Sequence, residues 1–63
     1  MTAADRETLS HAAALLDGEA LSLRLSHAKG ERNDDWTGEE RALSFYNDMR
    51  ATAIRLYDIA GVV

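Results

Sequence analysis

Two histidines, each preceded by a serine, are the residues of this chain whose types suit acid–base chemistry. The pairs are Ser10-His11 and Ser26-His27. Neighbouring residues on a helix point about 100° apart, so neither serine can face its histidine as a catalytic nucleophile faces its base. Neither histidine belongs to an HExxH or ExxH metal motif. We interpret both as surface or interface residues, with His27 near a loop, where it could sense pH.

Acidic residues gather in the middle of the chain, at Glu31, Asp34, Asp35, Glu39 and Glu40. Calcium prefers carboxylate oxygens, but this stretch lacks the D-x-D/N-x-D/N-G spacing and the terminal bidentate glutamate of an EF-hand loop. We expect a solvated acidic turn instead. The glycines are isolated, so no glycine-rich phosphate loop is present in the sequence. We therefore expect no catalytic residue, no metal site, no cofactor and no enzyme activity.

Aromatic and arginine side chains are the remaining candidates, because such residues dominate binding hot spots. The possible contacts to a partner are Trp36, Tyr46, Arg50 and Tyr57. Tyr46 and Arg50 are one helical turn apart, which also suits a structural role with the arginine stacked over the ring. We favour that structural role. Trp36 also has two interpretations: it contacts a partner protein, or it fixes the start of the next helix.

The helix after Trp36 is expected over residues 38–60. Thr37 followed by Glu40 is typical of a capping box, in which each side chain bonds the backbone amide of the other residue. Trp36 then precedes the cap, and its ring can pack on the stem or guanidinium of Arg41 and fix the angle of entry. We favour this structural interpretation of Trp36 over contact with a partner protein.

A first helix is expected over residues 3–28, followed by an acidic turn over residues 29–37. Thr2 and Asp5 fit a capping pair at its start. Gly30 suits the position just past its end, and Gly61 does the same for the second helix.

The stretch around Asp17-Gly18 allows a different interpretation of the first helix. Aspartate followed by glycine is a turn signal, and the leucines at 21, 23 and 25 alternate with polar residues as in a strand. A strand would need a partner for its backbone groups, and no other stretch alternates in this way. We therefore retain the helix, with a kink or break near Gly18 as the alternative.

Both helices carry apolar residues at alternating steps of four and three, which is the spacing of a helix–helix seam. Alanine at one of the two core positions allows a neighbouring helix to approach closely. The seam consists of Leu9, Ala13, Leu16, Ala20 and Leu23, together with Tyr46, Met49, Ala53, Leu56 and Ala60.

Further apolar residues widen both helical faces beyond this seam, as in a helix inside a bundle. A single hairpin would leave much of these faces exposed, and such surfaces mark sites of association. We expect an all-α protein with a single domain over residues 1–63: a two-helix antiparallel hairpin that dimerises into a four-helix bundle.

Composition excludes several classes of function. The chain has 63 residues, no cysteine and a formal net charge of −4. Disulfides, zinc bound by cysteine and thiol chemistry are excluded, and the scattered basic residues argue against binding to nucleic acid. Because no apolar run reaches the ~20 residues of a membrane span and the first residues do not form a signal peptide, we expect a cytoplasmic protein without membrane contact.

The segment DDWTGEE, with Asp35, Trp36 and Glu39, and Tyr46 after it, resembles small helical proteins, mostly uncharacterised, that are carried on bacterial phages and plasmids. In length and two-helix plan the chain is also similar to the plasmid copy-number regulator Rop, a dimeric hairpin that binds RNA. We expect a small dimeric accessory protein, of mobile-element origin, that acts by binding another protein. The alternatives are a nucleic-acid regulator similar to Rop and an acidic inhibitor that mimics nucleic acid.

Overall fold

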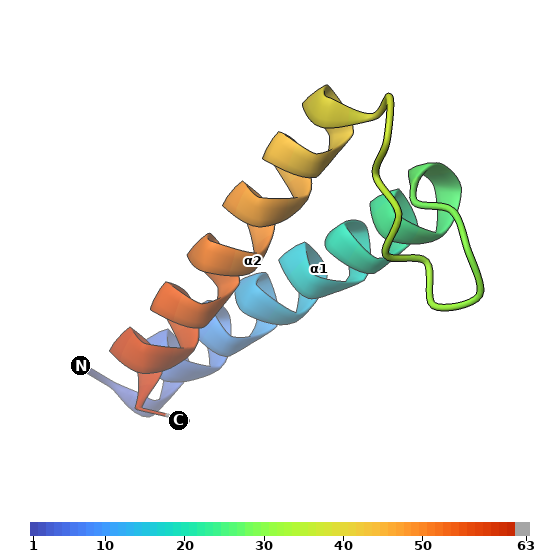
Figure 1. The fold of residues 1–63 in the computed structure, drawn as a ribbon. Helices are drawn as coiled ribbons and strands as arrows, with labels where there is room; N and C mark the ends of the chain where they lie inside the picture. Colours follow the sequence, from blue (N-terminus) through green and yellow to red (C-terminus); the bar gives the residue numbers. More distant parts are fainter. Residues whose placement is uncertain (62–63) are drawn as a thin grey trace.

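In the computed structural model, residues 1–61 are described as two helices and the segment that joins them (Figure 1). Helix α1 spans Ala3–His27 and helix α2 spans Glu40–Ala60. The helices pack against each other in opposite directions, so the start of α1 and the end of α2 lie at one end of the molecule. The expected all-α antiparallel hairpin is confirmed.

Helix α1 begins where the sequence indicates. The hydroxyl of Thr2 accepts a hydrogen bond from the Asp5 amide at 3.1 Å, which satisfies one of the free amides at a helix start. The helix continues without interruption through Asp17 and Gly18. A glycine inside a helix costs about 1 kcal/mol relative to alanine, but seam residues on both sides of Gly18 hold the backbone in place. Neither the break nor the strand is present.

The end of α1 differs from the expected one. His27 is the last helical residue and Ala28 is already extended, with its amide bonded to the Arg24 carbonyl at 2.9 Å. Gly30 therefore does not cap the helix directly. Its φ of +88° serves a later turn, inside the segment of residues 28–39 that we call the connection. At the end of α2, by contrast, Gly61 takes the left-handed conformation expected of it, with φ of +75°.

The capping box predicted at Thr37 is wrong. Helix α2 begins at Glu40 instead of residue 38, and its N-cap, Glu39, makes no side-chain capping bond. Two local features explain the shift. Gly38 has a φ of +80°, which a right-handed helix does not accommodate, and the Thr37 hydroxyl donates to Asp35.

Alanine alone forms the buried core of the described residues, and no large side chain is fully enclosed. The buried residues are Ala13, Ala20, Ala28, Ala42, Ala53 and Ala60. The larger members of the predicted seam are half-buried, and these are Leu9, Leu16, Leu23, Tyr46, Met49 and Leu56. The hairpin is thus held by closely approaching backbones, while its large apolar side chains are shielded on one side only.

Candidate functional site

Two sides flank the alanine seam, and their chemistry differs. Successive residues of an α-helix are about 100° apart, so residues just before and just after a buried alanine fall on opposite sides of it. Asp17 and Arg50 pair across the helices and define one side. Leu23 and Phe45 line a common hollow and define the other side. We call the side with Asp17 and Arg50, which also holds Tyr46, the tyrosine face. We call the side with Leu23 and Phe45 the leucine face.

The tyrosine face contains a shallow groove of about 240 Å³ across the middle of the hairpin. Its lining is mostly polar and consists of Asp17, Leu21, Arg24, Tyr46 and Arg50. The Arg50 guanidinium donates to the Asp17 carboxylate, and both side chains are about one-third to one-half exposed. This ion pair joins the two helices directly.

Arg50 therefore does not have the role that the sequence suggested. We expected its guanidinium to stack over the ring of Tyr46, but it is engaged by Asp17 instead. In the part of the chain that the structure describes, Arg41 makes a cation–π contact instead, with its guanidinium carbon 6.0 Å from the centroid of the Phe45 ring. Tyr57, the other tyrosine among the candidates, is half-buried and follows Arg50 by two helical turns.

Trp36 packs against Tyr46, not against Arg41. The two ring centroids are 5.1 Å apart and the ring planes are tilted by 40°, a favourable geometry for an aromatic pair. Because α2 begins at Glu40, Trp36 does not occupy the position directly before the N-cap. It secures the connection to the second turn of α2, and its side chain is half-buried against Tyr46, which lines the groove.

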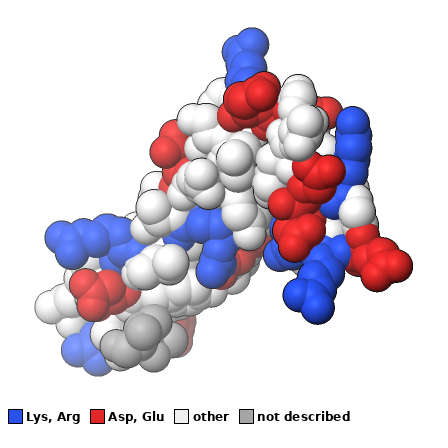
Figure 2. Space-filling view, in the orientation of Figure 1, with Lys and Arg blue, Asp and Glu red and all other residues white. Residues whose placement is uncertain are grey.

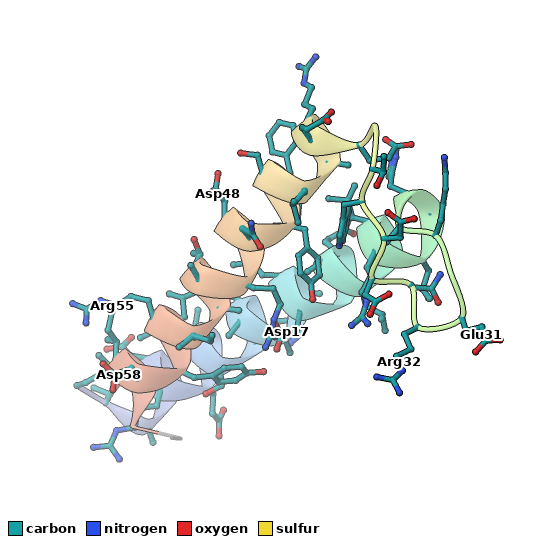
Figure 3. The ribbon with its side chains drawn as sticks, in the orientation of Figure 1. Asp17, Glu31, Arg32, Asp48, Arg55 and Asp58 are labelled. Carbon is teal, nitrogen blue, oxygen red and sulfur yellow. The ribbon has the colours of Figure 1, made fainter. Side chains whose placement is uncertain are left out.

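Hydrogen bonds from side chains to the backbone shape the connection. Arg24 donates from Nε to the Asn33 carbonyl at 2.7 Å and from Nη2 to the Arg32 carbonyl at 2.6 Å. Asn33 in turn donates to the Ala28 carbonyl at 3.2 Å. Lys29 and Asp35 exchange two backbone hydrogen bonds, which closes the turn. Figure 3 shows Glu31 and Arg32 at the outer tip of this turn.

Asp35 organises the second half of the connection. One of its carboxylate oxygens accepts from the Thr37 hydroxyl at 2.6 Å and from the Thr37 amide at 3.0 Å. These two bonds favour the ionised form and lower the pKa of the Asp35 carboxyl from its usual value. The residue lies on the surface, so the bonds act locally in the turn.

His27 and Glu39 meet at the two ends of the connection, with 3.1 Å between Nδ1 of the histidine and Oε2 of the glutamate. His27 thus lies near the loop, in the place expected of it. This contact explains why Glu39 does not cap α2, since its carboxylate is turned toward α1. The pair borders the hollow of the leucine face, which has a volume of about 290 Å³ and is lined by Leu23, His27, Glu39, Arg41, Ala42 and Phe45.

Charged residues are interspersed over the surface in view in Figure 2, where Lys and Arg alternate with Asp and Glu. Arg24, Arg50 and Arg55 are each engaged by a carbonyl or a carboxylate, the last by Asp58 at 3.5 Å. Asp48, Arg55 and Asp58 project from the side of α2 that faces away from α1 (Figure 3). Within residues 1–61, no three His, Asp or Glu side chains lie together as metal ligands would.

Sequence reasoning missed three residues of the groove: Asp17, Leu21 and Arg24. Asp17 was interpreted only as part of a turn signal, because its partner Arg50 lies on the other helix. The contacts of Arg24 depend on the path of the connection, which no periodicity reveals. The spacing of Tyr46 and Arg50 was the one available signal for this groove.

A scan against models of protein families finds no match, and searches of curated proteins and of solved structures also return none. Among the described residues, neither helix combines the length and apolar character that crossing a lipid bilayer requires.

Proposed function

We propose that this chain is a small homodimeric helical protein that acts in the cytoplasm by binding another protein, without catalysis. Two hairpins form a four-helix bundle in this proposal, and the tyrosine face of each hairpin is available to the partner. An accessory role on a mobile element, as implied by the resemblance at DDWTGEE, belongs to the same proposal.

The proposal rests on one contrast: the buried side chains are small alanines, whereas the large apolar side chains of the helices are exposed. Among residues 1–61 only alanines are buried, whereas six large apolar side chains on the two helices are between 44% and 59% exposed. These residues are Leu15, Leu21, Leu25, Phe45, Ile54 and Ile59. Phe45 and Ile59 lie on the leucine face, whereas Leu21 and Ile54 lie on the tyrosine face. A domain of this size has little stability to spare, and association is the remaining way to cover apolar surface in a chain without cysteine.

The size and shape of the hairpin agree with this proposal. A compact monomer of 6.9 kDa exposes about 4,000 Å², and this chain exposes 4604 Å². The excess of roughly 600 Å² approaches the ~800 Å² that each partner contributes to a standard interface. The radius of gyration is 13.5 Å, against about 11 Å for a compact chain of this length. An elongated hairpin of this kind supports its proposed place as one half of a four-helix bundle.

The tyrosine face supports the choice of a protein partner. Its groove combines a tyrosine, two arginines and an apolar leucine, and the half-buried Trp36 lies against the same tyrosine. Tryptophan, tyrosine and arginine are the residues most enriched at the centres of protein interfaces. Arg24 and Arg50 already have acceptors within the hairpin, and a phosphate backbone would have to compete with these.

Affinity capture with matched variants tests the proposal. The baits are the wild-type chain, Arg50→Gln on the tyrosine face, and Arg55→Gln on the outer side of α2 as the control; both arginines are ion-paired in the hairpin. We expect the wild type and Arg55→Gln to capture the same protein after nuclease treatment, and Arg50→Gln to lose it. Recovery that nuclease abolishes would support the nucleic-acid regulator instead. Equal capture by all three baits would contradict binding at the tyrosine face.

A further inference from the structure

The leucine face has the composition of an interface between two copies of the chain. Leu16 and Leu23 lie on this side of the α1 seam, and Met49, Leu56 and Phe45 lie on the same side of α2, as their positions relative to the buried alanines require. Phe45, Thr52 and Ile59 recur every seven residues and extend this stripe along α2. These side chains are half-buried or exposed along one side of the hairpin, and all of them are apolar except that of the exposed Thr52.

The tyrosine face is a poorer place for a second copy. It carries the Asp17–Arg50 ion pair near its centre, and Arg24 lies in the same groove. Covering these groups would remove charges from water, and the desolvation penalty can exceed the gain from the ion pair. The leucine face carries charged groups too, since Arg41 and the His27–Glu39 pair line its hollow, but these lie at the end near the connection. A second copy can therefore cover the centre of the leucine face without burying an ion pair.

The two ends of the leucine face differ, since one is hollowed and the other carries an exposed isoleucine. The end near the connection holds the hollow of about 290 Å³ between Leu23, Ala42 and Phe45. At the opposite end Ile59 is 44% exposed and follows Leu56 on the same stripe. A two-fold axis perpendicular to the helices brings the Ile59 end of each copy onto the hollow end of the other, so the same contact forms twice.

Charge favours the same orientation. Residues 28–41, which form the connection and the first turn of α2, contain Lys29, Arg32 and Arg41 but five acidic residues, Glu31, Asp34, Asp35, Glu39 and Glu40. The segment is therefore net acidic. Placing the connections of two copies at one end of a bundle would bring like charges together, whereas placing them at opposite ends separates them by the 43 Å length of the hairpin.

We propose that a second copy of this chain docks on the leucine face in the opposite direction, with Ile59 of each copy in the hollow beside Phe45 of the other. This inference rests on the proposed dimer, and it specifies the face and the orientation. The tyrosine faces then lie on the outside of the bundle, where a partner can reach them.

A distance measurement between two spin labels tests the orientation. The chain has no cysteine, so Arg32→Cys at the tip of the connection accepts a single label per copy (Figure 3). We expect a label-to-label distance near the 43 Å length of the hairpin. A distance below about 20 Å, the width of two helices, would overturn the orientation although the dimer stands. Absence of any dipolar coupling together with a monomeric mass would overturn the dimer itself.

A pair of substitutions tests the face. Ile59→Asp introduces a carboxylate into each proposed contact, whereas Ile54→Asp makes the same change at a site on the other side of α2 that is 55% exposed. We expect Ile59→Asp to raise the dimer dissociation constant on the order of 100-fold and Ile54→Asp to leave it within a few-fold of the wild type. Circular dichroism at high protein concentration verifies that both variants are helical. If Ile54→Asp raises the dissociation constant more than Ile59→Asp does, the dimer interface lies on the tyrosine face instead.

Discussion

The seam between the helices and the connection that joins them are stabilised in opposite ways. The seam is apolar and depends on close backbone approach, with Ala13, Ala20 and Ala53 fully buried. The connection has little apolar contact beyond Ala28 and one aromatic pair, and it depends on hydrogen bonds that Arg24 and Asn33 donate and that Asp35 accepts. The seam should therefore be sensitive to side-chain volume, and the connection to the loss of individual donors and acceptors.

The largest effect is expected from Ala20→Leu. Ala20 is completely buried between the helices, and a leucine there would force the backbones apart or distort rotamers, at a cost of about 3 kcal/mol in the free energy of unfolding. Chemical denaturation at one fixed protein concentration measures the loss, since dimerisation makes stability concentration-dependent. Ala14→Leu, at an exposed position of the same helix, is the control and should change stability by less than about 0.5 kcal/mol. Equal effects would show that the seam is not close-packed.

Trp36→Ala is the most disruptive change expected in the connection. It removes the aromatic pair with Tyr46 and the apolar cover at that end of α2, and we expect a loss of about 2 kcal/mol in the free energy of unfolding. Trp36→Phe retains a ring and should recover more than half of the loss. If Trp36→Ala has unchanged stability but no longer captures the partner, Trp36 is a contact residue for that partner and has no structural role.

Arg24→Ala should have a smaller effect, about 1 kcal/mol, because its two hydrogen bonds to carbonyls are partly exposed to water. Hydrogen exchange of the amides at residues 29–35 is the sharper measurement, since loosening of the connection should speed their exchange while the amides of the α1 centre keep their protection. Arg32→Ala removes a neighbouring exposed guanidinium but leaves the carbonyl acceptor, and it should leave exchange unchanged. Faster exchange in both variants would argue against the specific role of Arg24.

Asp35 should give the smallest effect, visible as a dependence of stability on pH. The Thr37 donors lower the pKa of Asp35 in the folded chain below its usual value of 3.8. The contribution is therefore fully present above that value and is lost as the pH falls through the lowered pKa. Denaturation of the wild type and Asp35→Asn over acidic pH should show a stability difference that shrinks toward low pH. Asp34→Asn is the control, and a difference that grows toward low pH would reverse the assignment.

Periodicity explains how much of this fold could be predicted from the sequence. Steps of four and three residues indicated both helices and placed Ala13, Ala20, Ala53 and Ala60 in one seam, because burial along a helix leaves a regular pattern. The Thr2 cap at the start of α1 could also be predicted, because the residue that it bonds, Asp5, is only three positions away.

The connection was predicted poorly for a physical reason. The start of α2 depends on competition for Thr37, whose hydroxyl bonds Asp35 rather than capping the helix, and on a left-handed Gly38. Trp36 contacts Tyr46 only because the path of the connection brings it beside α2. The groove likewise depends on Asp17 meeting Arg50 across the hairpin. Contacts between distant residues leave no local pattern, so the sequence suggested the candidates but not their partners.

The molar mass of the chain in solution tests the central claim most directly, namely that this hairpin is half of a bundle. Sedimentation equilibrium at micromolar concentration should give a mass about twice the 6.9 kDa of the chain, with dissociation on dilution. A single species of 6.9 kDa over the same range would contradict the account, because the exposed apolar side chains of the leucine face would then have no second copy to cover them.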